Sequence, residues 1–468
     1  MSVTAAPTVR DPYVLSPDDV KEPPQGWRAS LRFLGPGLIL SASIVGSGEL
    51  VATTALGAET GFVLLWMVVF STLVKVAVQV ELCRWSIVTG QPALQGYNKV
   101  PPRFGRVGWV SLMWMLLAVV KVLQVGGVVG GTAAALSILF PIGSAPLEFT
   151  SLAIWTAIVV VAAIVSLYSN RYSLIERGAV LLTIVFVLIT CGIAFGLPFT
   201  EIGYGLDDIG SGLQLALPAG AIGAALAMFG LTGVTSDEIT YYTYWCIEKG
   251  YARWVGPNDG SPEWKSRAQG WIRVMYKDAM VSWLVYTIGT LAFFIMGAAV
   301  LHPKGLVPED NAMITTLSAT YTNTLGEWGG VLYLVGAVAV LGSTLWAALP
   351  SWARVAANAV AICGGFDWQR DIEQRMRWMR VFTVIFPIAW GSAYLYFTSP
   401  VLMIQTGGFI GGLFLIAVTI ATFYLRKTEV EPELRGGPWF AAALVTSAVL
   451  IAGLGVYTAL SAFGVTVG

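Results

Sequence analysis

Charge is scarce in this sequence. Only 12% of its 468 residues are Asp, Glu, Lys or Arg, about half the share that soluble globular proteins carry. Hydrophobic residues make up 56%, and Gly, Trp and Phe are abundant, as in transmembrane helices and their interfacial belts. The shortage of charge excludes an ordinary soluble domain. The composition predicts a polytopic membrane protein whose main partner is the lipid bilayer.

Other scarcities exclude further classes. The net charge is zero, so a nucleic-acid partner and a polybasic lipid anchor are not expected. One histidine and four widely spaced cysteines form no zinc or disulfide pattern, and no phosphate-binding loop or nucleophile elbow is present. We therefore predict no enzyme and no resident cofactor. Residues 1–30 lack the apolar core of a signal peptide, which predicts a short cytoplasmic tail.

Eleven apolar stretches approach the ~20 residues that a membrane-spanning helix needs. They lie near 34–57, 61–83, 108–140, 149–168, 177–197, 213–245, 276–300, 327–349, 379–397, 401–425 and 438–463. Lys and Arg collect in every second loop between them, as expected of cytoplasmic loops. This pattern predicts an all-α protein of the cell (inner or plasma) membrane, with its N-terminus cytoplasmic and its C-terminus outside.

Two of these stretches are interrupted by charge and by helix-breaking residues. The first contains Gly46-Ser47-Gly48 followed by Glu49, and the sixth contains a polar run from Thr232 to Glu238. An intramembrane carboxylate is costly and usually faces a cavity or a partner. Irregular backbone at that depth is stable only where protein or water satisfies it. The simpler alternative is that the glycines permit close helix packing and that the acids lie at a membrane surface.

The two interrupted stretches are five spans apart, which predicts two repeats, about 34–197 and 213–425. An extra helix, 438–463, completes one transmembrane domain of residues 31–463. Repeats with an odd number of spans have opposite topology, and many secondary transporters bind their substrate where the first helix of each repeat is broken. The candidate substrate-binding residues are Ser43, Gly46, Ser47, Gly48, Glu49, Thr232, Thr235, Ser236, Asp237 and Glu238.

The residues also resemble a known family. The segment 35–66, "GPGLILSASIVGSGELVATTALGAETGFVLLW", is similar to the first-helix region of the Nramp divalent-metal transporters. The segments "VTG" (88–90), "GGTAAALSILF" (130–140) and "NRYSLIE" (170–176) are similar to later parts of that family. Weaker likeness covers about residues 30 to 460. The resemblance implies a leucine-transporter-type inverted-repeat fold of eleven transmembrane helices, with helices 1 and 6 interrupted.

The functional motifs depart from the family's pattern. Its Asp-Pro-Gly-Asn motif is replaced by the run from Gly46 to Glu49, and its Met-Pro-His motif by the run from Thr235 to Asp237. Val125 and Val128 stand where the family carries acids tied to proton movement. The resemblance therefore carries over the scaffold, but not the family's usual metal and proton chemistry.

Loss of the methionine removes a soft ligand, and the oxygen-rich replacement favours hard ions. Glu49 and Asp237 are the candidate metal ligands, in a wet site of the kind that Mg²⁺ accepts. By resemblance, backbone carbonyls near Ser43 and Thr232 add ligands, and the resemblance extends to Nramp-related magnesium transporters. We predict a secondary transporter that moves a divalent cation, Mg²⁺-like rather than Mn²⁺ or Fe²⁺, by alternating access. Two acids without a cation repel each other, which makes a coupling proton conceivable through Glu49 or Asp237.

Two other functions stay open. Amide groups at the Gly-Ser-Gly break could bind the carboxylate of an amino acid or another small organic solute, with Asp237 facing its amine. A non-transporting membrane sensor is the second alternative, because the aromatic stretch from Tyr241 to Lys265 could dock a protein partner of unknown identity. Lys121, in the third span, could neutralise a site carboxylate or take the place of a cation.

Overall fold

The computed structural model describes residues 11–46, 48–168, 172–308 and 310–462, most of them helical. Ser47 of the predicted site lies outside the described residues, as do residues 1–10 of the predicted tail and residue 463. The first half contains α1 (Gly26–Ser30), α2 (Pro36–Ile44), α3 (Thr54–Thr60), α4 (Leu65–Val74), α5 (Val76–Thr89), α6 (Ala93–Tyr97), a hairpin of β1 (Arg103–Phe104) and β2 (Val107–Gly108), α7 (Trp109–Leu139), α8 (Phe149–Tyr168), α9 (Tyr172–Gly196) and α10 (Leu206–Gly212). The second half contains α11 (Ile222–Leu231), α12 (Ser236–Lys249), α13 (Tyr251–Val255), α14 (Pro262–Met296), α15 (Met313–Leu325), α16 (Glu327–Ile362), α17 (Ile372–Phe397), α18 (Pro400–Glu429) and α19 (Pro438–Ala462).

The number of membrane crossings agrees with the sequence. Within the described ranges, nine helical stretches are long and apolar enough to cross a membrane. One of them, Pro36–Thr89, has 54 residues, enough for two crossings, and it turns at Gly61, whose φ is +62°. The pair α11 and α12 adds a further crossing, because each half is too short to qualify alone. The result is the predicted set of eleven.

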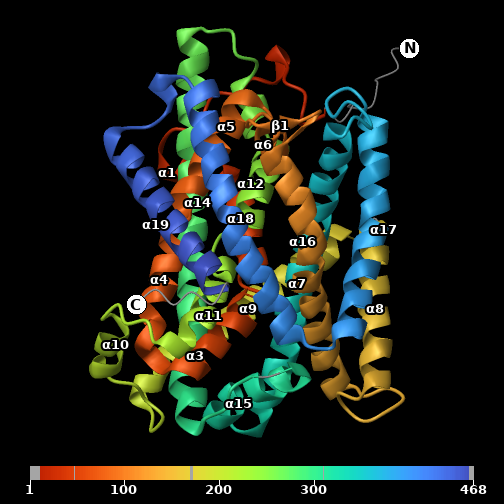
Figure 1. The fold of residues 1–468 in the computed structure, drawn as a ribbon, viewed down its shortest axis with the longest axis vertical. Coiled ribbons are helices and arrows are strands. Elements are labelled where there is room, and N and C mark those ends of the chain that lie inside the picture. Colours follow the sequence, from red (N-terminus) through yellow and green to blue (C-terminus); the bar gives the residue numbers. More distant parts are fainter. Residues whose placement is uncertain (1–10, 47, 169–171, 309, 463–468) are drawn as a thin grey trace.

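The loops sort to two ends of the molecule. Figure 1 places α6 and β1, which follow the second crossing, at one end, and α10 and α15 at the other. Large apolar side chains are exposed on the outer faces of the helices, among them Val119 of α7, Val161 of α8 and Leu188 of α9. Outward-facing apolar surface of this kind suits contact with lipid.

The N-terminal end of α2 is held by α14. Asp278 accepts hydrogen bonds from the backbone N–H groups of Gly35 (2.8 Å) and Gly37 (2.6 Å), which no residue within α2 can satisfy. The Tyr242 hydroxyl of α12 donates to the same carboxylate over 2.9 Å. A Cβ atom at position 37 would lie 2.6 Å from the carbonyl oxygen of Asp278. Close approach of the two helices therefore requires glycine there.

The aromatic stretch after the sixth crossing is helical and packed. The stretch forms the C-terminal part of α12, α13 and the start of α14, so the helix that contains the predicted seventh crossing begins at Pro262, ahead of residue 276. Tyr241, Tyr242 and Tyr244 are all buried. These three side chains belong to the core of the bundle, so they are not exposed for a partner in this structure.

Several charged side chains are buried in the bundle. They are Glu49, Lys75, Glu81, Arg84, Lys121, Asp237, Asp278 and Arg375. A buried charge is costly unless it is paired or hydrogen-bonded, so the partners of each one indicate its role. Four of them, Glu49, Lys75, Lys121 and Asp237, lie close to the two broken helices.

Candidate functional site

Both predicted interruptions are confirmed. The first crossing leaves α2 at Ile44, turns through Val45 and Gly46, and resumes as a π-helical stretch (Gly48–Thr53) that leads into α3. The second leaves α11 at Leu231, and α12 begins at Ser236. At each break the described backbone between the two helical parts is not helical, so its peptide groups need partners outside their own helices.

The two breaks touch each other, and glycine makes this contact possible. A Cβ atom at position 48 would lie 2.8 Å from the carbonyl oxygen of Leu231, at the end of α11. A Cβ atom at position 46 would lie 1.6 Å from the Oγ1 atom of Thr344 on α16. Close packing is thus a real function of both glycines.

A capping arrangement fixes the start of α12. The Thr235 hydroxyl accepts a hydrogen bond from the N–H of Asp237 over 3.2 Å, and Glu238 accepts from the N–H of Thr235 over 3.3 Å. The Thr235 hydroxyl also donates to Glu238. This reciprocal capping box orients the first turn of the helix and places two adjacent carboxylates at its positive end.

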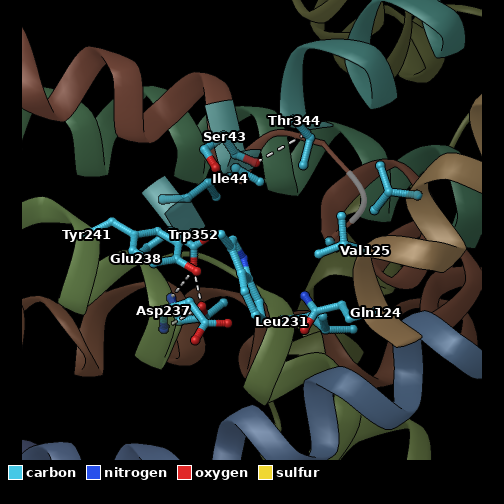
Figure 2. A pocket seen from close by; sticks show the side chains of 14 residues that line it. Ser43, Ile44, Gln124, Val125, Leu231, Asp237, Glu238, Tyr241, Thr344 and Trp352 are labelled. Carbon is cyan, nitrogen blue, oxygen red and sulfur yellow. Dashed lines mark hydrogen bonds between the residues drawn. The ribbon is translucent and has the colours of Figure 1, made fainter. Parts of the chain in front are cut away.

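An internal cavity lies between the breaks. It measures about 40 Å³, which is room for a few water molecules. Its lining residues are Ser43, Ile44, Gly48, Gln124, Val125, Val128, Leu231, Thr235, Asp237, Glu238, Tyr241, Thr344, Ala348 and Trp352. Figure 2 shows Asp237, Glu238 and Tyr241 on one side of Trp352, and Gln124 and Val125 on the other.

Two polar atoms on the cavity wall lack a partner. Among the described residues, nothing forms a hydrogen bond with the buried Tyr241 hydroxyl or with the Oε1 atom of Gln124. Buried polar groups in native proteins are nearly always hydrogen-bonded, to protein or to ordered water. The cavity therefore has the chemistry to hold water or a polar cargo.

Lys121 of α7 forms an ion pair with Asp237 at this cavity. The two side chains are only 4% and 10% exposed. Lys121 is the one charged residue of the 31-residue helix α7, and it lies near the middle of that helix. The pair confirms the expectation that Lys121 could neutralise a site carboxylate.

Glu49 does not share the cavity with Asp237. Its Oε1 atom accepts hydrogen bonds from the N–H of Gly233 (3.1 Å) and the hydroxyl of Thr290 (3.2 Å), while its Oε2 atom has no partner in the described part of the chain. It is fully buried and absent from the cavity lining. The two predicted metal ligands therefore do not line the same cavity in this structure.

Lys75 lies at the second break, after α11, and is fully buried. Its ammonium group donates to the carbonyl oxygen of Phe229 over 2.7 Å and to that of Thr232. The carbonyl of Ser43, the other backbone ligand suggested by resemblance, accepts from the Thr344 hydroxyl over 3.3 Å. Both carbonyls therefore already have hydrogen-bond donors in this conformation.

The predicted residues fall into two sets. Ser43, Gly48, Thr235, Asp237 and Glu238 line the cavity, whereas Gly46, Glu49, Thr232 and Ser236 do not. Whether any of them binds cargo stays a prediction. In the described ranges no three His, Cys, Asp or Glu side chains come together as a metal site.

Sequence reasoning missed part of the lining. Gln124, Tyr241, Thr344 and Trp352 all face the cavity. One signal was available: Gln124, Val125 and Val128 follow Lys121 by three, four and seven residues, which puts all of them on one face of a helix. Thr344 and Trp352 come from α16, where no charged residue precedes them at helical spacing as Lys121 does in α7.

This arrangement of two broken helices around a central cavity is that of the leucine-transporter-type fold. The structure is similar to that of a manganese transporter mutant of Eremococcus coleocola, with a TM-score of 0.66, 16% identity, and coverage of 97% of this chain and 93% of that one. It is also similar to Mhp1, a nucleobase-cation-symport-1 family transporter (TM-score 0.53, 15% identity, coverage of 96% of each chain). At these identities the likeness shows the fold.

The family follows from the sequence. The family described as "Natural resistance-associated macrophage protein-like" (Nramp) matches residues 37–461, so the chain belongs to the Nramp family. "Metal transporter Nramp6.2" of Populus trichocarpa is 25% identical over 220 residues, which are 46% of this chain and 37% of that protein. The alignment thus spans little more than a third of the length of that relative. Family and fold point to a transporter rather than an enzyme.

Proposed function

We propose that this protein is a secondary transporter that moves a hard divalent cation, Mg²⁺-like rather than Mn²⁺ or Fe²⁺, by alternating access. The ligand chemistry of the cavity carries the proposal. Its charged wall residues are Asp237 and Glu238, and its other polar side chains are hydroxyls, an amide and an indole. No Met, Cys or His is found among the described residues that line it. Oxygen ligands without sulfur favour hard ions.

The size and polarity of the cavity support a partly hydrated ion. Mg²⁺ usually keeps several waters and binds through one or two carboxylates. The cavity has room for a few waters, and the unpartnered Tyr241 hydroxyl and Gln124 carbonyl offer them hydrogen bonds. A bare, fully protein-coordinated ion would need a larger cluster of acids.

Orientation and location belong to the same proposal. We place the protein in the cell membrane with its N-terminus in the cytoplasm, because the basic loops alternate with loops poor in Lys and Arg. The end of the molecule that carries α6 and β1 would then face the cytoplasm (Figure 1).

Uptake into proteoliposomes that contain an ion-sensitive dye tests the cargo. Mg²⁺ should enter faster than Mn²⁺ or Ca²⁺, and Asp237→Asn and Glu238→Gln should each reduce Mg²⁺ uptake by about tenfold or more, because each removes one carboxylate ligand. Glu327→Gln, which neutralises an exposed acid at the start of α16, is the matched control and should transport like the wild type. Absence of cation uptake by the wild type would refute the proposal. Cation binding without flux would favour the sensor.

A coupling proton is part of this proposal, with Glu49 as its carrier. Glu49 is fully buried, does not line the cavity and has one carboxylate oxygen without a partner among the described residues. A proton would remove the cost of burying that charge. An inward proton gradient should accelerate uptake by the wild type but not by Glu49→Gln. Equal acceleration of both would exclude Glu49 as the carrier.

A small organic solute is the second candidate. The ion pair with Lys121 neutralises Asp237, and Tyr241 and Trp352 give the cavity aromatic walls. Such a wall suits a solute with an apolar part better than it suits an ion. Calorimetric titration with amino acids, repeated on Asp237→Asn, distinguishes the two: heat of binding for an amino acid and none for Mg²⁺ would favour the solute.

A further inference from the structure

Lys121 places a positive charge where a cation would contact Asp237. The ammonium group lies between two helices: Asp237 of α12 accepts its hydrogen bond, and a Cβ atom at Gly411 of α18 would lie 2.9 Å from its Nζ atom. Glycine at position 411 thus leaves the space that the ammonium group fills. The neighbours of Lys121 on its own helix face, Gln124 and Val125, line the cavity directly.

The position of Lys121 changes the net charge of the site. With all three groups ionised, the carboxylates of Asp237 and Glu238 and the ammonium group of Lys121 leave one net negative charge. Without the lysine the same site carries two, which matches a divalent cation. An ammonium group and a metal ion at the same carboxylate repel each other, so each weakens the binding of the other.

The burial of the pair argues that its partner can be exchanged. Two buried ions gain little net stability from each other, because desolvation offsets most of their attraction. Asp237 also faces the cavity, so an incoming ion can reach the carboxylate without unfolding the helix. The lysine is attached at the middle of α7, which keeps it within reach of Asp237 after displacement.

We propose that Lys121 is a tethered competitor of the transported cation: its ammonium group occupies Asp237 when the site is empty, must move aside when the cation binds, and returns to displace it. Lys121 thereby lowers the resting affinity and promotes release of the cargo. This inference rests on the proposed transport of a divalent cation.

Calorimetric titration of the purified full chain with Mg²⁺ tests the competition. Lys121→Leu, which removes the amine and adds no ligand atom, should bind Mg²⁺ about tenfold or more tightly than the wild type. Lys121→Arg keeps the competing charge and should stay near the wild-type affinity. Lys99→Leu, which removes a lysine from the partly exposed ion pair with Glu429, is the matched control and should also stay there. Adding Asp237→Asn to Lys121→Leu should abolish the gain.

A measurement on the wild type covers the case in which Lys121→Leu fails to fold. In protein labelled with ¹⁵N at the lysine Nζ atoms, Mg²⁺ should shift the signal that is missing from Lys121→Arg. Unchanged or weaker binding by Lys121→Leu, or an unshifted Lys121 signal at saturating Mg²⁺, would overturn the inference and leave the proposed function standing. If neither the wild type nor Lys121→Leu binds a divalent cation, the proposed function fails and the inference fails with it.

Discussion

Two regions beside the broken helices each contain one lysine and one carboxylate, and they use them in different ways. At the cavity, Lys121 is paired with Asp237. Away from the cavity lining, Lys75 and Glu49 form no ion pair with each other in the part of the chain that the structure describes. Lys75 donates instead to the last carbonyls of α11 and to the break that follows, and Glu49 accepts from an amide and a hydroxyl.

The partner, rather than the burial, distinguishes the two lysines. Lys75 is 0% exposed and Lys121 is 3% exposed. The C-terminal end of a helix has carbonyl groups without partners and a negative dipole, so an ammonium group there acts as a cap that holds a broken helix together. A carboxylate on a cavity wall can exchange its partner with a dissolved ion. The same residue type is therefore expected to be structural in one region and functional in the other.

Substitution of Lys75, the cap of α11, should have the largest effect on stability. Lys75→Leu leaves two buried carbonyls without their charged donor, which should lower the free energy of unfolding by about 2–5 kcal/mol. Thermal unfolding in detergent measures this loss, and Mg²⁺ should not restore it. A stable Lys75→Leu variant with altered Mg²⁺ affinity would contradict the structural role.

An intermediate effect on thermal stability is expected from substitution of Lys121, and its dependence on Mg²⁺ should distinguish Lys121 from Lys75. Lys121→Leu should gain more thermal stability from saturating Mg²⁺ than the wild type does. A tenfold gain in affinity corresponds to about 1.4 kcal/mol of additional stabilisation at the same Mg²⁺ concentration. Unfolding scans with and without Mg²⁺ measure this difference. Equal stabilisation of both proteins would show that Lys121 does not compete with the ion.

The smallest effect is expected from substitution of Glu49. Glu49→Gln keeps an acceptor for Gly233 and Thr290 and lies outside the cavity, so Mg²⁺ affinity should change by less than about threefold. Calorimetric titration beside Asp237→Asn makes the comparison direct. A loss as large as that of Asp237→Asn would place Glu49 in the cation site after all.

Much of the fold could be predicted because the membrane simplifies the problem. Apolar length, the alternation of basic loops and the need for satisfied backbone groups fix the crossings and the two breaks. The start of α14 at Pro262 could not be predicted in this way, because a helix that continues past the membrane surface loses its apolar signature there. The packing of Tyr241 and Tyr242 into the core was missed because it depends on contacts with other helices, such as that of the Tyr242 hydroxyl with Asp278.

The site was harder to predict because direction matters more than position. Glu49 and Asp237 both follow a break, but only Asp237 lines the cavity. Lys75 donates to a carbonyl of α11 from another crossing. Such partners are set by tertiary packing, which spacing in one sequence does not reveal.

The carboxylate of Asp278 links the two broken crossings. It accepts hydrogen bonds from both amides at the start of α2 and from the Tyr242 hydroxyl at the middle of α12, so one half of each broken crossing is anchored to the same residue of α14. These hydrogen bonds couple α2 and α12 to α14. Under the proposed alternating access, the three helices would therefore move together.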